Sequence, residues 1–195
     1  MSRVNAPSLH LPARHRAALL HTGTVVTAIG ADQWSAPTPC ADWDVRALVN
    51  HVVAGNHWAA RLGAGETIAQ VGTDLDGDLL GDDPVAAYDA SAEPAARVFE
   101  RHGAMDAMCA VSYGPVPGSM YAGHRFIDVL VHGWDMAVAT GQDAELPEEL
   151  VEACWRVVEP QLAMLAGSGM FGDPQPIPTD ADIQTRLLAT LGRRV

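Results

Sequence analysis

Apolar residues recur at intervals of three and four positions through most of the chain, and no sustained alternation of apolar and polar positions is present. The first pattern is typical of amphipathic helices and the second would be typical of strands, so a mainly helical chain is predicted. The expected helices lie near 9–31, 44–62, 84–101, 118–140 and 147–167, with a short one near 180–191.

Local signals mark where two of these helices begin. Asp44 precedes a helical pattern and can accept a hydrogen bond from its first turn. Asp83 followed by Pro84 combines a capping residue with proline at the first helical position, where the missing N–H costs nothing. Each of these two signals predicts the start of a helix.

Two connections are long and non-helical. The stretch 63–83 is rich in Gly, Asp and Thr, and a connection of this length more often borders a site or is mobile than not. The stretch 168–180 contains three prolines. Four long helices with one long crossover predict an all-α, up-down four-helix bundle with additional C-terminal helices, forming one domain over residues 1–195.

Composition limits the cellular location and the binding partners that we expect. The 195-residue chain is 48% hydrophobic, but no apolar stretch approaches the roughly 20 residues that span a bilayer, and the N-terminus lacks the pattern of a secretory signal. The formal net charge is −12, and all 12 basic residues are arginines. A cytoplasmic protein that binds neither membrane nor nucleic acid is expected, because this charge repels phosphate backbones.

Three cysteines, at 40, 109 and 154, are too few and too widely spaced for a disulfide framework or a cysteine-rich zinc site. Small buried hydrophobes are the favoured interpretation. Cys40 is the exception to consider, because it lies in a proline-rich turn beside Trp43.

The predicted helix 118–140 carries a polar stripe. At about 100° per residue, four ionisable side chains fall within a stripe roughly 80° wide: Arg125, Asp128, His132 and Asp135. Carboxylate and imidazole four residues apart can both bind one ion. The alternative is a surface ridge that contains an Asp–Arg ion pair.

The predicted helix 44–62 carries a further candidate metal ligand, His51. Gly55 and Trp58 share a face with His51, whereas His57 points elsewhere. A lone histidine on such a face is more often a buried core residue than a ligand. Two imidazoles and one carboxylate would leave coordination positions open, as in a catalytic metal site.

The chain resembles a known family over nearly its whole length, through the segments TPCADWDVRALVNHV (38–52), DVLVHGWD (128–135), GQD (141–143) and LLATLGRR (187–194). They are similar to DinB/YfiT-like metalloenzymes, in the actinobacterial branch related to the N-terminal domain of mycothiol-dependent maleylpyruvate isomerase. The resemblance implies a DinB-like bundle that holds a divalent ion through His51, Asp128 and His132. Zinc is the expected ion, with nickel, iron or manganese as alternatives. The isomerase has glutamate in place of Asp128, so the resemblance predicts the fold and ligands rather than a particular reaction.

These features together favour a metal-dependent thiol transferase or isomerase. The ion would hold a low-molecular-weight thiol of the mycothiol type as its thiolate, which adds to a small electrophile. Asp135 would orient His132. His124 and Arg125 would contact an anionic substrate, or else serve as surface or ion-pair residues.

Two other functions fit the same residues. Metal-activated water would give a hydrolase, and a protein that only binds metal or a small ligand would need no catalytic group. A pocket lined by Trp43, Trp58 and Trp134 fits each function, although these tryptophans more often form bundle core. Small molecules are the expected partners, and a homodimer is compatible with such a bundle.

Overall fold

The computed structural model describes residues 10–165 and 171–195. Its elements, in chain order, are α1 (Leu11–Thr27), α2 (Val45–Gly63), α3 (Ile68–Val71), α4 (Pro84–Glu100), β1 (Met108–Val111), β2 (Gly114–Pro117), α5 (Gly118–Thr140), α6 (Glu148–Val158), a 3-10 turn η1 (Glu159–Gln161), α7 (Leu162–Leu165) and α8 (Ile183–Thr190). The first residue of the predicted helix 9–31, the last two of 147–167 and residues 168–170 lie outside the described residues.

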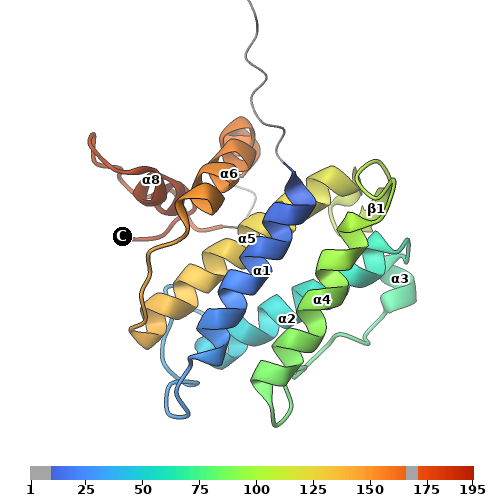
Figure 1. Ribbon diagram of the computed structural model, residues 1–195, viewed down its shortest axis with the longest axis horizontal. Helices are drawn as coiled ribbons and strands as arrows, with labels where there is room; N and C mark the ends of the chain where they lie inside the picture. Colours follow the sequence, from blue (N-terminus) through green and yellow to red (C-terminus); the bar gives the residue numbers. More distant parts are fainter. Residues whose placement is uncertain (1–9, 166–170) are drawn as a thin grey trace, which may run out of the picture.

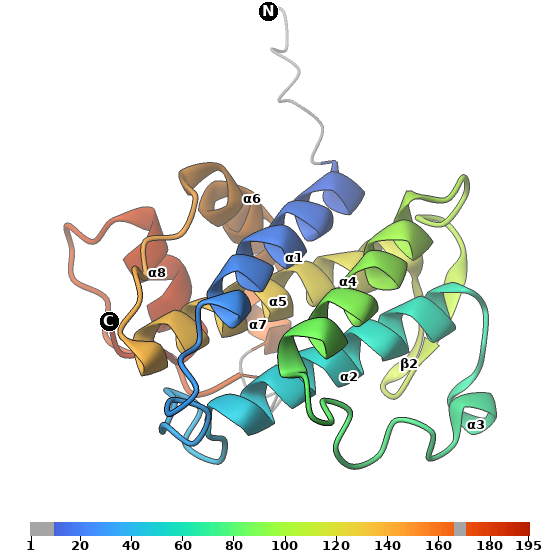
Figure 2. The ribbon, with the colours of Figure 1, turned by 60° about the horizontal axis from the view of Figure 1, so that its bottom comes forward.

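Four long helices pack against one another around a shared apolar core (Figure 1). Helix α1 contacts α4 and α5, and α2 contacts the same two helices. The C-terminal helices α6 and α8 pack together on one side of this group, and α6 also contacts α5 (Figures 1 and 2). The prediction of a mainly helical chain is confirmed.

The predicted helix starts are present. The Asp44 carboxylate accepts a hydrogen bond from the Ala47 backbone N–H, and Asp83 accepts one from Ala86. Such caps replace hydrogen bonds that the first turn of a helix cannot make internally. They fix where α2 and α4 begin.

The ends of the first and fifth predicted helices were wrong. Helix α1 ends at Thr27 rather than at 31, and a turn follows in which the Gly30 N–H donates to the side chain of Gln33. Helix α6 ends at Val158, because Pro160 has no N–H with which to continue the hydrogen-bond ladder. A 3-10 turn and the short α7 follow in its place.

The structure adds a small antiparallel hairpin, β1–β2, with Met108 opposite Pro117 and Val111 opposite Gly114. No strand was predicted, and the all-α expectation is wrong at this point. The long connection after α2 contains the short α3 and lies against α2, where the Asn50 side chain bonds Gly77 and Leu79. Within the described ranges, no helix combines the length and apolar character needed to cross a membrane.

Candidate functional site

A cavity of about 830 Å³ opens between α2 and α5. The turn before α2, the hairpin and the C-terminal segment complete its wall. Its lining residues are Pro39, Cys40, Ala41, Asp42, Trp43, His51, Gly55, Trp58, Tyr113, Tyr121, His124, Arg125, Ile127, Asp128, His132, Phe171, Gly172, Gly192 and Arg193. No residue of the long connection 63–83 lines this cavity.

The three predicted metal ligands meet in the wall of this cavity. His51 Nε2 lies 3.3 Å from Asp128 Oδ1, and His132 Nε2 lies 3.5 Å from the same oxygen. One ligand atom from each residue lies within 4.8 Å of the others. The side chains of His51 and Asp128 remain 35% and 21% exposed, whereas that of His132 is 8% exposed. The group is therefore reachable from the cavity.

These separations fit a metal ion. In a tetrahedral zinc site with nitrogen and oxygen ligands at about 2.0–2.1 Å, two ligand atoms lie roughly 3.3–3.4 Å apart. The two distances to Asp128 Oδ1 are close to this value. The donor chemistry, two imidazoles and one carboxylate, also suits a divalent ion.

The carboxylate of Asp128 is shared between two partners. Its Oδ1 faces the two histidines, whereas its Oδ2 accepts a hydrogen bond of 2.9 Å from the buried Arg125 guanidinium. Burial raises the pKa of Asp128, but the charges of Arg125 and His132 outweigh burial and hold that pKa well below its usual range. Asp128 is therefore ionised and keeps one oxygen toward the cluster.

Arg125 is held in place by its surroundings on α2. A Cβ added to Gly55 would lie 2.3 Å from Arg125 Nη1, so the guanidinium occupies the space that a side chain would need. Its Nη2 also lies 3.4 Å from Asn56 Oδ1. Of the two roles expected for Arg125, the structure shows the ion pair with Asp128.

On the other side of the cluster, His132 Nδ1 lies 2.9 Å from Asp135 Oδ2. This is the contact expected of a carboxylate that orients a ligand imidazole. Burial lowers the pKa of His132, but the carboxylates of Asp128 and Asp135 outweigh burial and hold it well above its usual value.

The sequence pattern missed Arg193, which comes from the C-terminal segment. Its Nε and Nη2 donate to the two oxygens of Asp135, at 3.1 and 2.7 Å. The partners are 58 residues apart, and no local spacing signals such a contact. Only the placement of the segment after α8 brings Arg193 to the cavity wall.

Cys40 also belongs to this wall. Its Sγ lies 3.3 Å from Asp135 Oδ2 and 3.9 Å from His132 Nδ1, so Cys40, His132 and Asp135 form a second group of donor atoms. The Arg193 guanidinium already contacts this group, at 3.4 Å from the sulfur. A cation there would be repelled by Arg193, so the first group is the better metal candidate.

The tryptophans divide between cavity and core. Trp43 lines the cavity and stacks on His51, with ring centroids 4.4 Å apart, and Trp58 lines it as well. Trp134 does not line the cavity: its side chain is buried in the apolar core, 4% exposed. The expectation that Trp134 forms part of the pocket is wrong, because its position on α5 faces the core.

His124 lines the cavity, but both of its ring nitrogens have protein partners. Nδ1 lies 2.7 Å from the Tyr113 hydroxyl, and Nε2 lies 3.1 Å from Gln161 Oε1. The side chain of Gln161 donates to the Val157 carbonyl, so its oxygen faces His124 and His124 Nε2 carries the hydrogen. His124 thus links the hairpin to the turn after α6.

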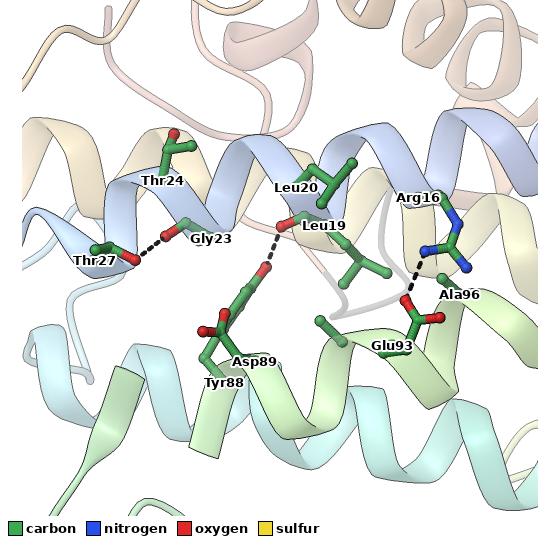
Figure 3. A pocket seen from close by; sticks show the side chains of 11 residues that line it. Arg16, Leu19, Leu20, Gly23, Thr24, Thr27, Tyr88, Asp89, Glu93 and Ala96 are labelled. Atoms are coloured by element: carbon green, nitrogen blue, oxygen red, sulfur yellow. Dashed lines mark hydrogen bonds and ion pairs between the residues drawn. The ribbon is translucent and has the colours of Figure 1, made fainter. Parts of the chain in front are cut away.

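A second, smaller hollow of about 400 Å³ lies between α1 and α4 (Figure 3). There the Tyr88 hydroxyl donates to the Leu19 carbonyl at 2.8 Å, and Arg16 pairs with Glu93 at 2.7 Å. Among the described residues, no group of metal-binding side chains lies in this hollow. The cavity between α2 and α5 is therefore the candidate site.

Comparison with known proteins identifies the family of this chain. A family model described as the mycothiol maleylpyruvate isomerase N-terminal domain matches residues 15–137. The matched range includes His51, Asp128 and His132, whereas Arg193 lies beyond it.

Two uncharacterised proteins, from two strains of Mycobacterium tuberculosis, are each 37% identical to this chain over 172 residues, which cover 86% of the chain and 88% of the relative. Two crystal structures of the mycothiol-dependent maleylpyruvate isomerase, one of them a mutant in which alanine replaces a histidine, have a similar fold, with TM-scores of 0.61 and 0.63. Each is 14% identical, and the match covers 88% of this chain and 77% of the other.

Proposed function

This chain belongs to the mycothiol maleylpyruvate isomerase N-terminal domain family, and from this premise we propose that it is a divalent-metal-dependent thiol enzyme. It transfers or isomerises a small electrophile with a low-molecular-weight thiol of the mycothiol type. Its helices form a DinB-like, up-down four-helix bundle, and the site lies between the second and the last long helix of that bundle.

One observation carries the proposal: three donor atoms from α2 and α5 converge at the spacing of a metal site, in the wall of a cavity. His51 Nε2, Asp128 Oδ1 and His132 Nε2 would hold the ion, which we expect to be zinc. Nickel, iron and manganese suit the same donors. Three protein ligands leave at least one position of a four-coordinate ion for a substrate.

When bound, the ion would supply the positive charge that removes the proton from a thiol whose pKa is otherwise near 8.5. Residues of the chain itself hold the metal ligands in position. Asp135 fixes the orientation of His132, and the stacked indole of Trp43 holds the ring of His51. The cavity of about 830 Å³ lies within the range of 300–1,000 Å³ that is common for small-molecule sites. It has room for a thiol and an electrophile together.

The first test is metal content. Protein purified without added metal is expected to contain close to one divalent ion per chain by elemental analysis. The His51→Ala, His132→Ala double variant loses the ion, because two of three ligands are gone. His57→Ala is the matched control, since His57 lies on the same helix but does not line the cavity. A metal-free wild type, or a double variant that keeps its ion, would contradict the proposed site.

The second test is thiol binding. With the ion bound, mycothiol is expected to raise the melting temperature, because a ligand that binds only the folded state stabilises it. Glutathione, a thiol of different structure, gives no shift, and neither thiol stabilises Asp128→Ala. If no thiol shifts the melting temperature but ester or amide substrates are hydrolysed, the thiol function is wrong and a metal-dependent hydrolase replaces it.

A further inference from the structure

We infer that Arg193 is a positioning residue for the metal centre, acting through Asp135 on the ligand His132. The inference rests on the proposed function, because it concerns how this chain holds the proposed ion. Arg193 never reaches the three donor atoms itself. Its guanidinium contacts the carboxylate that in turn holds the ring of His132.

The contact geometry is specific. Arg193 binds both oxygens of Asp135, and its Nη1 donates to the Leu191 carbonyl at 2.7 Å. Two parallel hydrogen bonds between guanidinium and carboxylate fix the rotation of both groups. Asp135 is thereby held with Oδ2 toward His132 Nδ1, which leaves His132 Nε2 directed at Asp128.

The charge balance requires this partner. Asp135 is completely buried, and a buried carboxylate is costly unless a cation or hydrogen bonds compensate it. When His132 binds a metal through Nε2, its ring is neutral and supplies only one hydrogen bond from Nδ1. Arg193 then provides the compensating charge, at 7% exposure.

The C-terminal backbone is shaped to deliver this side chain. Gly192 has φ +87°, a conformation that other residues rarely adopt, and a Cβ at this position would lie 2.6 Å from Gly172. Earlier in the chain, the side chain of Gln184 binds the backbone of Ala144 and Leu146 and anchors α8. The anchor at Gln184 is separate from the contacts of Arg193.

The test measures metal affinity in a double-mutant cycle. Zinc affinity is determined by competition with a chelating dye for the wild type, Arg193→Gln, Asp135→Asn and the double variant. Loss of such an outer partner typically weakens metal binding by about 10–100-fold. Because Arg193 acts through Asp135, the double variant should bind no more weakly than Asp135→Asn alone.

A second readout follows the geometry of the centre. The visible spectrum of bound Co²⁺ should change in Arg193→Gln, since the ring of His132 is no longer fixed. Gln184→Ala is the matched control: it loosens α8 without touching Asp135, and it should keep both the affinity and the spectrum of the wild type. Arg193→Lys keeps the charge but not the paired hydrogen bonds, gives an intermediate affinity, and serves if the glutamine variant does not fold.

The outcomes separate the two proposals. If the wild type binds zinc and Arg193→Gln binds it equally well, or if the losses of the two single variants multiply, the role of Arg193 is wrong and the metal centre stands. If Gln184→Ala weakens binding as much as Arg193→Gln, then anchoring of the segment explains the effect and the inference also fails. A wild type that binds no zinc overturns the proposed function together with the inference.

Discussion

His15 is a buried histidine with no polar partner for either ring nitrogen in the described parts of the chain. It lies on α1 and packs edge-on against Phe99, with ring centroids 5.4 Å apart. Burial, together with the charges of Arg125 and Arg16, lowers the pKa of His15 to about 3. The imidazole is therefore neutral in the folded protein at every moderately acidic pH.

This pKa predicts how stability depends on pH. The unfolded chain binds a proton at His15 below about 6.5, whereas the folded chain does not until about 3. Above the unfolded pKa, His15 is neutral in both states and the free energy of unfolding keeps its full value. Below that pKa only the unfolded chain takes up the proton, so the free energy of unfolding falls by about 1.4 kcal/mol per pH unit. Urea unfolding at pH 7.5 and 5.5 measures this loss.

His15→Leu should remove this part of the pH dependence, and the control His10→Ala should keep it, because His10 is exposed. Equal slopes for the wild type and His15→Leu would show that His15 does not take up a proton on unfolding in this range.

Single residues of the site were predictable as far as local spacing reaches. The stripe on the helix 118–140 placed Asp128, His132 and Asp135 on one face, and the structure brings them together around one centre. Arg193 could not be predicted, because its contact depends on how a separate segment packs. Trp134 was misplaced, because on a helix whose faces are nearly all buried the periodicity does not distinguish core from cavity.

The close approach of helices α2 and α5 depends on a small residue. Gly55 leaves room for the Arg125 guanidinium, and a Cβ there would lie only 2.3 Å from Nη1. We expect Gly55→Ala to lower the free energy of unfolding by about 1–3 kcal/mol through overpacking. It should also weaken metal binding, because Arg125 can no longer hold Asp128 Oδ2.

The matched control is Gly63→Ala, on the same helix. A Cβ there would lie 2.8 Å from Val98 Cγ2, so it crowds an apolar contact far along α2 from Gly55. Urea unfolding and dye competition on both variants separate the effects. Gly63→Ala should lose stability but not affinity, and an unchanged affinity in Gly55→Ala would contradict the role of Arg125.

Helix bounds were predicted well where capping is local and poorly where it is not. The helix expected at 118–140 is found as Gly118–Thr140. The helix expected at 44–62 is shifted by one residue at both ends, and the one expected at 84–101 ends one residue earlier. The hairpin escaped prediction because its second strand, Gly114–Pro117, contains two prolines, which normally argue against a strand. Its pairing comes from contacts across a turn, not from periodicity.

The residues of the site come from parts of the chain that are far apart in sequence. His51 and Asp128 are 77 residues apart, and Arg193 comes from the last three residues of the chain. The packing of α2 against α5 brings the donors together, supported by an apolar core that extends across both helices.

The separation of the donor residues along the chain bears on whether folding or metal binding comes first. A zinc finger folds around its metal, because the donors meet only when the ion is present. Here the helices would assemble first and present a finished site, so loading would follow folding and would stabilise the folded state. The metal would then be an exchangeable ligand of the folded protein. Which ion is bound would depend on the ions available in the cell as much as on the preference of the donor atoms.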